Sequence, residues 1–228
     1  MIEIIRQILK KNIVIHNFLK NLINFLNLRI LIRMYERKLF RNKINNNKNQ
    51  NQKLKLIIGS GDEYFENWIS SEKHTLDVTK NESWEDFFQP NEIDNILAEH
   101  VFEHFTIEDT ENSLKNIHKY LKKNGCFRIA VPDGNFPSKE YIDWVKPYGK
   151  APGADTHTIL YNYKTLLEVL KKNKFKCKLI EYYDENSNFH PNYNYDFNGY
   201  VHRSSRNDNR NSSKKLNYTS LIIDAYKS

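Results

Sequence analysis

The chain has 228 residues, of which 39% are hydrophobic, and its formal net charge at pH 7 is +7. This length suits one ordinary domain with a sizeable core and some additional segments. No apolar run reaches the roughly 18–20 residues of a membrane span, and Lys10, Lys11 and Asn12 interrupt the N-terminal run too early for a signal peptide. The two cysteines, Cys126 and Cys177, lie far apart and are expected to be reduced thiols, so we predict a cytoplasmic protein.

The positive charge is concentrated at the N-terminal end. Residues 1–53 hold twelve Lys and Arg and two Asp and Glu, a net charge of +10, whereas residues 54–228 have a net charge of −3. A core that binds nucleic acid is more often basic itself. We therefore expect no nucleic-acid partner.

Residues 1–41 are predicted to form a basic amphipathic arm, with a helix over residues 2–38. Apolar residues recur there at three-to-four spacing, with polar residues on other faces. The apolar positions are Ile15, Phe18, Leu19, Leu22, Ile23, Leu26 and Ile30. Because this wide apolar face needs cover, three hypotheses stay open: contact with an anionic membrane surface, contact with a protein partner or second copy, and packing on the domain as a cap. The first would make the protein peripheral to a membrane.

The next segment, residues 42–53, reads NKINNNKNQNQK and is predicted to be a flexible linker, because it is polar and low in complexity. From residue 54 onward, short β-rich runs alternate with helical ones. This alternation predicts an α/β domain over residues 54–228, with a mostly parallel sheet and helices on both faces. The last two strands, KCKLIEYY and YTSLIIDAY, have no clear helix between them and are expected to pair antiparallel.

A glycine turn follows the first strand of this domain. In Gly59-Ser60-Gly61 neither glycine has a Cβ, so the backbone can turn tightly and approach a ligand closely. Tyr64 replaces the third glycine of the dinucleotide fingerprint, and the P-loop lysine is missing. These features disfavour a nicotinamide or flavin enzyme.

Further polar residues follow other strands. Glu72 and Asp77 either help to hold a nucleoside, since such a carboxylate can accept both ribose hydroxyl hydrogens, or are solvated loop acids. Glu99 and His100 end the IDNIL strand, and residues 131–134 (VPDG) end the next one. Because ligands of open α/β sheets bind at the carboxyl ends of the strands, these residues are expected to face the same crevice as the glycine turn.

The stretch from His100 to His104 also spells H-x-x-E-H, the inverted zinc-peptidase pattern. That pattern predicts two imidazoles on one helix face, with the carboxylate of Glu103 beside them to activate water. Nothing points to a particular distant residue as the third ligand. A zinc hydrolase is therefore the less favoured hypothesis, and no metal is expected.

Five blocks of the chain resemble, in the right order, the class I S-adenosylmethionine-dependent methyltransferases. The similarity is to small bacterial predicted methyltransferases of the GWI…HVLEH…PDG type, and it covers about residues 54–228. The blocks are LIIGSGDEYFENWI, LDVT, IDNILAEHVFEHF, LKKNGCFRIAVPDG and LYNYKTLLEVL. The resemblance implies a Rossmann-like, seven-stranded sheet with its last strand antiparallel, and S-adenosylmethionine as the cofactor.

The resemblance also assigns roles to individual residues by motif position. Gly59, Ser60 and Gly61 would line the methionine part of the cofactor, Glu72 would hold the ribose hydroxyls, Asp77 would lie beside the adenine, and Glu99 and His100 would border the cofactor and acceptor pockets. The chain departs from the family pattern in two places. Ser60 replaces the usual cysteine or alanine, and the segment from Gly61 to Trp68 is too short for a full helix after the first strand.

The implied activity is methyl transfer to a small polar acceptor. Most of the catalysis would come from proximity and orientation. The candidates for a base are His100, Asp133 and His157. Residues 190–210, with their aromatic, hydrogen-bonding and arginine side chains, suit a sugar or surface-polysaccharide precursor, or else form a solvated loop. A non-catalytic module that keeps the fold without the cofactor is the main alternative.

Overall fold

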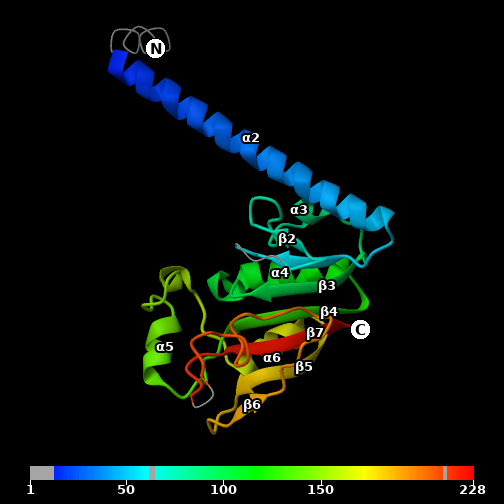
Figure 1. The fold of residues 1–228 in the computed structure, drawn as a ribbon, viewed down its shortest axis with the longest axis vertical. Coiled ribbons are helices and arrows are strands. Elements are labelled where there is room, and N and C mark those ends of the chain that lie inside the picture. The colour runs from blue at the N-terminus through cyan, green and yellow to red at the C-terminus, as the bar shows by residue number, and fades with distance from the viewer. Residues whose placement is uncertain (1–12, 62–64, 213–214) are drawn as a thin grey trace.

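The computed structural model describes residues 13–61, 65–212 and 215–228. The described strands form one seven-stranded sheet with the order β2-β1-β3-β4-β7-β5-β6 (Figure 1). In chain order the strands are β1 (Lys55–Ile58), β2 (Ile69–Ser71), β3 (Ile93–Glu99), β4 (Leu121–Pro132), β5 (Phe175–Tyr183), β6 (Phe189–Pro191) and β7 (Ser220–Lys227).

The sheet is mostly parallel, and its direction reverses at the last strand. β2, β1, β3 and β4 pair in parallel, whereas β7 lies antiparallel to both of its neighbours, β4 and β5. The short β6 pairs antiparallel with β5 at the edge. The structure thus confirms a Rossmann-like α/β sheet with an antiparallel last strand, and the antiparallel pairing of the two strands that have no helix between them.

Helices cover one face of this sheet. They are α3 (Asn81–Glu85), α4 (Ile107–Tyr120) and α6 (Tyr163–Lys172), and their buried side chains join one core with the strands. The start of α4 follows the local sequence, because the Thr106 hydroxyl accepts a hydrogen bond from the Asp109 amide, at 3.1 Å, as an N-cap. Asn162 and Thr165 form a capping box at the start of α6.

The other face carries no helix among the described residues, which corrects the expectation of helices on both faces. Ile57, Leu97 and Ile222 point to this face, and Tyr193 and Val201 pack on them. These last two belong to residues 192–219, which we call the cover segment. The connections that would carry helices on this side do not form them in their described parts. The described part of the β1–β2 connection consists of turns, and residues 192–212 and 215–219 of the cover segment contain no helix.

A long helix, α2 (Ile13–Asn49), forms the N-terminal arm and projects away from the sheet (Figure 1). It extends eight residues into the expected flexible linker, since residues 42–49 are helical. Phe40 and Ile44 are buried in the core and anchor this end of the helix, which explains why an asparagine-rich stretch is ordered. Residues 2–12 of the predicted helix lie outside the described residues. In the described part of the chain, no helix is long and apolar enough to cross a membrane.

A buried arginine fastens the cover segment to the sheet. Arg128, in the middle of β4, has no exposed surface and donates from Nε and Nη2 to Asp224 of β7, at 2.7 and 2.8 Å. Its Nη1 and Nη2 also donate to Asp196, at 3.0 and 2.9 Å, and Nη1 donates to the Gly199 carbonyl, at 2.7 Å. Burial acts to lower the pKa of Arg128, but the two carboxylates outweigh it, and the pKa is raised. The guanidinium therefore stays charged and holds both partners.

We expect Arg128→Met to lower the free energy of unfolding by about 3–5 kcal/mol, because it leaves the buried Asp224 carboxylate without its partner. Urea denaturation monitored by circular dichroism measures the change. The double variant Arg128→Met/Asp224→Leu should lose less than Arg128→Met alone, since no charge is then stranded. Lys164→Ala, which removes the exposed ion pair with Glu185, is the matched control and should cost less than about 1 kcal/mol. Equal losses for Arg128→Met and Lys164→Ala would contradict this role of the arginine.

Candidate functional site

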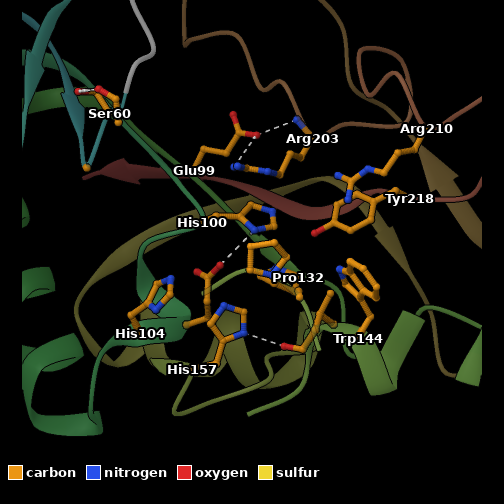
Figure 2. Close-up of a pocket in the computed structure, with 16 residues that line it drawn as sticks. Ser60, Glu99, His100, His104, Pro132, Trp144, His157, Arg203, Arg210 and Tyr218 are labelled. Carbon is orange, nitrogen blue, oxygen red and sulfur yellow. Dashed lines mark hydrogen bonds and ion pairs between the residues drawn. The ribbon is translucent and has the colours of Figure 1, made fainter. Parts of the chain in front are cut away.

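A cavity of about 510 Å³ lies at the carboxyl ends of β1, β3 and β4 (Figure 2). Its far wall comes from α5 (Lys139–Val145), the loop that follows it, and the cover segment. The position fits the rule for open α/β sheets, because β1 has β2 on one side and β3 on the other, which makes a switch point between β1 and β3. The lining residues are Gly59, Ser60, Gly61, Glu99, His100, Glu103, His104, Pro132, Trp144, Val145, Ala151, Pro152, His157, Arg203, Arg210 and Tyr218.

The glycine turn forms one edge of the cavity in a backbone conformation that other residues rarely adopt. Gly59 and Gly61 have φ angles of 61° and 55°. A Cβ on Gly59 would lie 2.7 Å from the Cγ2 atom of Val101, whereas a Cβ on Gly61 would meet no described atom within 4 Å. The turn therefore keeps Gly59 tight against Val101, whereas the described residues leave open space beside Gly61.

Glu72 supports this turn from behind. Its Oε1 atom accepts hydrogen bonds from the Gly61 amide, at 2.6 Å, and from the Ser60 hydroxyl, at 3.0 Å. Asp77 instead accepts from the amide and hydroxyl of Thr79. Neither carboxylate is among the residues that line the cavity. The structure thus brings Gly59, Ser60 and Gly61 to the cavity together with Glu99, and leaves Glu72 and Asp77 outside it.

Glu99 is buried at the end of β3 and attaches the cover segment there. Its two carboxylate oxygens accept hydrogen bonds from the backbone amides of His202 and Arg203, at 2.9 and 2.7 Å. The Arg203 guanidinium lies 3.7 Å from the same carboxylate. This contact places an arginine beside the edge of the cavity that Glu99 and the glycine turn form.

His100 lines the cavity with both of its ring nitrogens engaged. Its φ angle of 53° is unusual for a residue with a side chain and turns the chain sharply after β3. The Ser220 hydroxyl donates its hydrogen to the Arg203 carbonyl, at 2.8 Å, so it accepts from His100 Nε2, at 2.9 Å. Nδ1 lies 3.2 Å from Oε1 of Glu103. His100 therefore has no uncommitted nitrogen to act as a base.

Asp133 does not reach the cavity. It is fully buried, and its two carboxylate oxygens accept hydrogen bonds from the amides of Asn135 and Tyr183, at 2.9 and 2.7 Å. Burial raises the pKa of Asp133 to about 6, against the lowering effect of these hydrogen bonds. These hydrogen bonds hold the end of β4 against the end of β5, so Asp133 has a structural role.

His157 lies on the cavity wall opposite Glu99 and next to His104 (Figure 2). Its Nδ1 contacts the Val145 carbonyl at 2.7 Å. Since a carbonyl oxygen can only accept, Nδ1 carries the hydrogen, and Nε2 keeps a lone pair. The rings of His104 and His157 meet edge to face, with centroids 4.6 Å apart. Of the three proposed bases, only His157 keeps a free basic nitrogen at this site.

The H-x-x-E-H stretch does not form the arrangement that the zinc pattern predicts. Residues 102–104 form a single 3-10 turn, η1 (Phe102–His104), so positions 100 and 104 do not share a helix face. The three donors that do converge, within 4.8 Å of one another, come from Glu103, His104 and His157. Burial lowers the pKa of His104, Glu103 opposes that shift, and the nearby His157 and His100 add to it.

Several cavity residues had no individual role in the sequence analysis. Arg210 donates from Nε to Asp208, at 2.8 Å, and its guanidinium carbon lies 3.4 Å from the ring centre of Tyr218. Burial raises the pKa of Tyr218 to about 12. Trp144 of α5 is 45% exposed at the same wall. The sequence signals for this side of the site were the candidate base His157 and the mixture of aromatic, hydrogen-bonding and arginine side chains in residues 190–210.

No protein-family model and no curated protein matches the chain. Solved structures with a similar fold include a SAM-dependent methyltransferase from Archaeoglobus fulgidus, at 14% identity and a TM-score of 0.42, covering 83% of this chain and 94% of that one. A SAM-dependent methyltransferase from Thermotoga maritima, titled "possible histamine N-methyltransferase", has 11% identity and a TM-score of 0.46, with 90% and 96% covered. Phosphoethanolamine N-methyltransferase 2 of Haemonchus contortus, in complex with S-adenosyl-L-methionine, has 14% identity and a TM-score of 0.35, with 57% of this chain and 35% of that one covered. At these identities the similarity concerns the fold alone.

The two glycines of the turn should differ in their tolerance of a side chain. We expect Gly61→Ala to destabilise the fold by about 1–2 kcal/mol, the cost of a left-handed conformation. Gly59→Ala should cost roughly 1–3 kcal/mol more, because its Cβ also meets Val101. Thermal unfolding of both variants measures the difference. In the Gly59→Ala background, Val101→Ala should be less harmful than in the wild type, and strict additivity would argue against the contact.

Proposed function

We propose that the chain is an S-adenosylmethionine-dependent methyltransferase acting on a small polar acceptor. The observation that carries the proposal is the cavity at the β1–β3 switch point, with a glycine turn on one edge and Glu99 on the next. The order of the sequence blocks and the antiparallel last strand support this choice among nucleotide-binding folds. The volume of about 510 Å³ falls within the roughly 300–1,000 Å³ usual for small-molecule sites.

The cofactor would lie against Gly59, Ser60 and Gly61, with Glu99 at its border. Positive-φ glycines allow the backbone to approach a ligand closely, and the open space beside Gly61 suits such a contact. A ribose contact from Glu72 would require this carboxylate to exchange its hydrogen bond with Gly61, and Asp77 would have to approach from outside the cavity. The roles of these two acids stay predictions.

The acceptor would occupy the side formed by α5, His157 and the cover segment. Trp144 offers a partly exposed ring on which a sugar can stack, and Arg203 and Arg210 offer hydrogen-bond donors to hydroxyl or anionic groups. A sugar or surface-polysaccharide precursor is consistent with these side chains. The other hypothesis for residues 190–210, a solvated loop, is disfavoured by their contacts with the sheet and cavity.

S-adenosylmethionine, when bound, supplies a methyl group on a sulfonium centre. The protein would hold the acceptor atom in line with that methyl group, and proximity would provide most of the rate. A hydroxyl acceptor must also lose its proton. The group responsible would lie at the His104–His157 wall, because His100 is engaged at both nitrogens and Asp133 lies outside the cavity.

Calorimetric titration of S-adenosylhomocysteine into the purified full chain tests the proposal, and we expect micromolar binding. Gly61→Asn should weaken this binding at least tenfold, because asparagine tolerates a positive φ and adds bulk at the cavity edge. Lys172→Ala, on the distant α6, is the control and should bind as the wild type does. Absence of binding to a folded sample would sink the proposal and favour a non-catalytic module.

We further propose that the projecting part of α2 contacts an anionic lipid surface. Every described side chain from residue 24 to residue 35 is exposed, including Leu28, Leu31 and Met34. The charged residues in this stretch are Arg29 and Arg33, both basic. An exposed apolar helix with only positive charge suits an anionic membrane interface better than a neutral one. The other end of α2 packs on the domain through Phe40 and Ile44, so the cap hypothesis describes only that end.

Flotation of the full chain with vesicles tests this contact. Binding to vesicles containing phosphatidylglycerol should exceed binding to pure phosphatidylcholine and should fall with added salt. Arg29→Glu/Arg33→Glu should lower the partition coefficient by at least roughly 30-fold, because loss of each basic residue costs about 1 kcal/mol and each new glutamate is also repelled by the anionic surface. Lys164→Glu/Lys172→Glu makes the same charge change on α6 and should have little effect. Equal binding to both kinds of vesicle would contradict the proposed contact with anionic lipid. So would a stable dimer, detected by light scattering, that does not bind vesicles.

A further inference from the structure

Glu103 is a buried carboxylate with one oxygen paired to His100 and the other without a hydrogen-bond partner among the described residues. Burial acts to raise the pKa of Glu103, but the neighbouring imidazoles of His100 and His104 outweigh it, and the pKa is lowered. Its exposed fraction is 1%, and neither of its oxygens accepts a hydrogen bond from the described residues. The His100 ring approaches Oε1 as an ion pair at 3.2 Å, but without hydrogen-bond alignment, and Oε2 has no such partner. Buried polar groups are nearly always hydrogen-bonded, and a buried charge is costly unless it is paired or coordinates a metal. The Oε2 atom of Glu103, which has no hydrogen-bond partner among the described residues, is therefore a candidate ligand for a cation.

Two imidazoles converge on this carboxylate with the tautomer that a metal requires. His157 donates from Nδ1 to the Val145 carbonyl, which leaves the lone pair on Nε2. His104 also carries its hydrogen on Nδ1, because this nitrogen contacts the Thr156 hydroxyl. The Thr156 hydroxyl donates to the Gly153 carbonyl, at 2.8 Å, so it accepts from His104 Nδ1, at 2.8 Å. Metal-binding histidines almost always make such a hydrogen bond from the nitrogen that is not bound to the metal.

We propose that Glu103, His104 and His157 bind a divalent transition-metal ion such as Zn²⁺ on the acceptor side of the cavity. The three donors lie within 4.8 Å of one another, and bond lengths of about 2.0–2.2 Å would draw them to roughly 3.4 Å apart. Two histidines and one carboxylate form a set with open coordination positions, which suits an ion that also binds substrate. Glu103 and His104 belong to η1, and His157 directly follows η2 (Ala154–Thr156), so modest loop movement can close the site.

Metal binding at this site does not depend on methyl transfer. The role of the ion in catalysis, however, rests on the proposed function. A bound ion lowers the pKa of a coordinated hydroxyl, so the acceptor would release its proton to solvent. The acceptor oxygen would then form a bond to the methyl carbon as the carbon–sulfur bond breaks, and sulfur would keep that electron pair as a neutral thioether. In this arrangement His157 acts as a ligand, and the ion replaces a side-chain base.

The test uses the full chain, stripped with a chelator and titrated with Zn²⁺ by calorimetry and with Co²⁺ by visible absorption. We expect one ion per chain and ligand-field bands from Co²⁺ with nitrogen and oxygen donors. Glu103→Gln and His104→Gln should each weaken Zn²⁺ binding by more than the roughly 10–100-fold typical of outer-sphere changes. Glu103→Gln should remain folded, because it keeps the size and shape of this buried side chain and removes a charge. His118→Gln, on α4 outside the cavity, is the control.

Titration of S-adenosylhomocysteine on the same samples separates the two proposals. If it binds to wild type and Zn²⁺ does not, the metal site is overturned and the proposed function stands. The metal site is equally overturned if Zn²⁺ binding is unchanged in Glu103→Gln and His104→Gln, since the ion then binds elsewhere. One-to-one Zn²⁺ binding that both variants abolish, without binding of S-adenosylhomocysteine, supports the metal site and overturns the proposed function.

Discussion

The buried guanidinium of Arg128 is the contact on which the architecture of the site depends. It lies on the sheet face that has no helix in the described part of the chain, and all five of its donor hydrogens are directed at Asp224, Asp196 or the Gly199 carbonyl. A desolvated charge of this kind is tolerated only when its partners are fixed in place. Arg128 therefore does more than join β4 to β7: it requires the cover segment to return to one position on the sheet.

Two buried acids continue this polar attachment toward the cavity. Glu181 accepts hydrogen bonds from the amide and hydroxyl of Ser205, both at 2.7 Å, and Glu99 accepts from the backbone at Arg203. A segment rich in asparagine, aspartate and arginine cannot bury enough apolar surface to be held by the hydrophobic effect alone. Directional hydrogen bonds to buried carboxylates replace that effect here. As a result, Arg203, Arg210 and Tyr218 occupy defined places on the cavity wall instead of a mobile loop.

Both walls of the cavity are built from turns and not from long helices. The glycine turn has no helix after it among the described residues, so its support comes from Glu72 behind it and from Val101 beside Gly59. On the opposite wall, η1 and η2 are single turns that bring Glu103, His104 and His157 together from distant parts of the chain. One wall is thus suited to a nucleoside, and the other to proton or metal chemistry.

The sequence by itself determined most of the strands, the two capped helices, the glycine turn and the antiparallel final pair, because hydrophobic period, caps and turn residues act over a few positions. It also placed Gly59, Ser60, Gly61, Glu99, His100 and His157 near one crevice, since strand ends of a parallel sheet share an edge. It did not predict the short β6, which lies in a polar stretch. Only the tertiary structure decided that Asp133 lies away from the cavity, that residues 42–49 are helical, and that His104 pairs with His157 and not with His100. Those outcomes depend on burial and on contacts between residues about 50 positions apart, which no local pattern encodes.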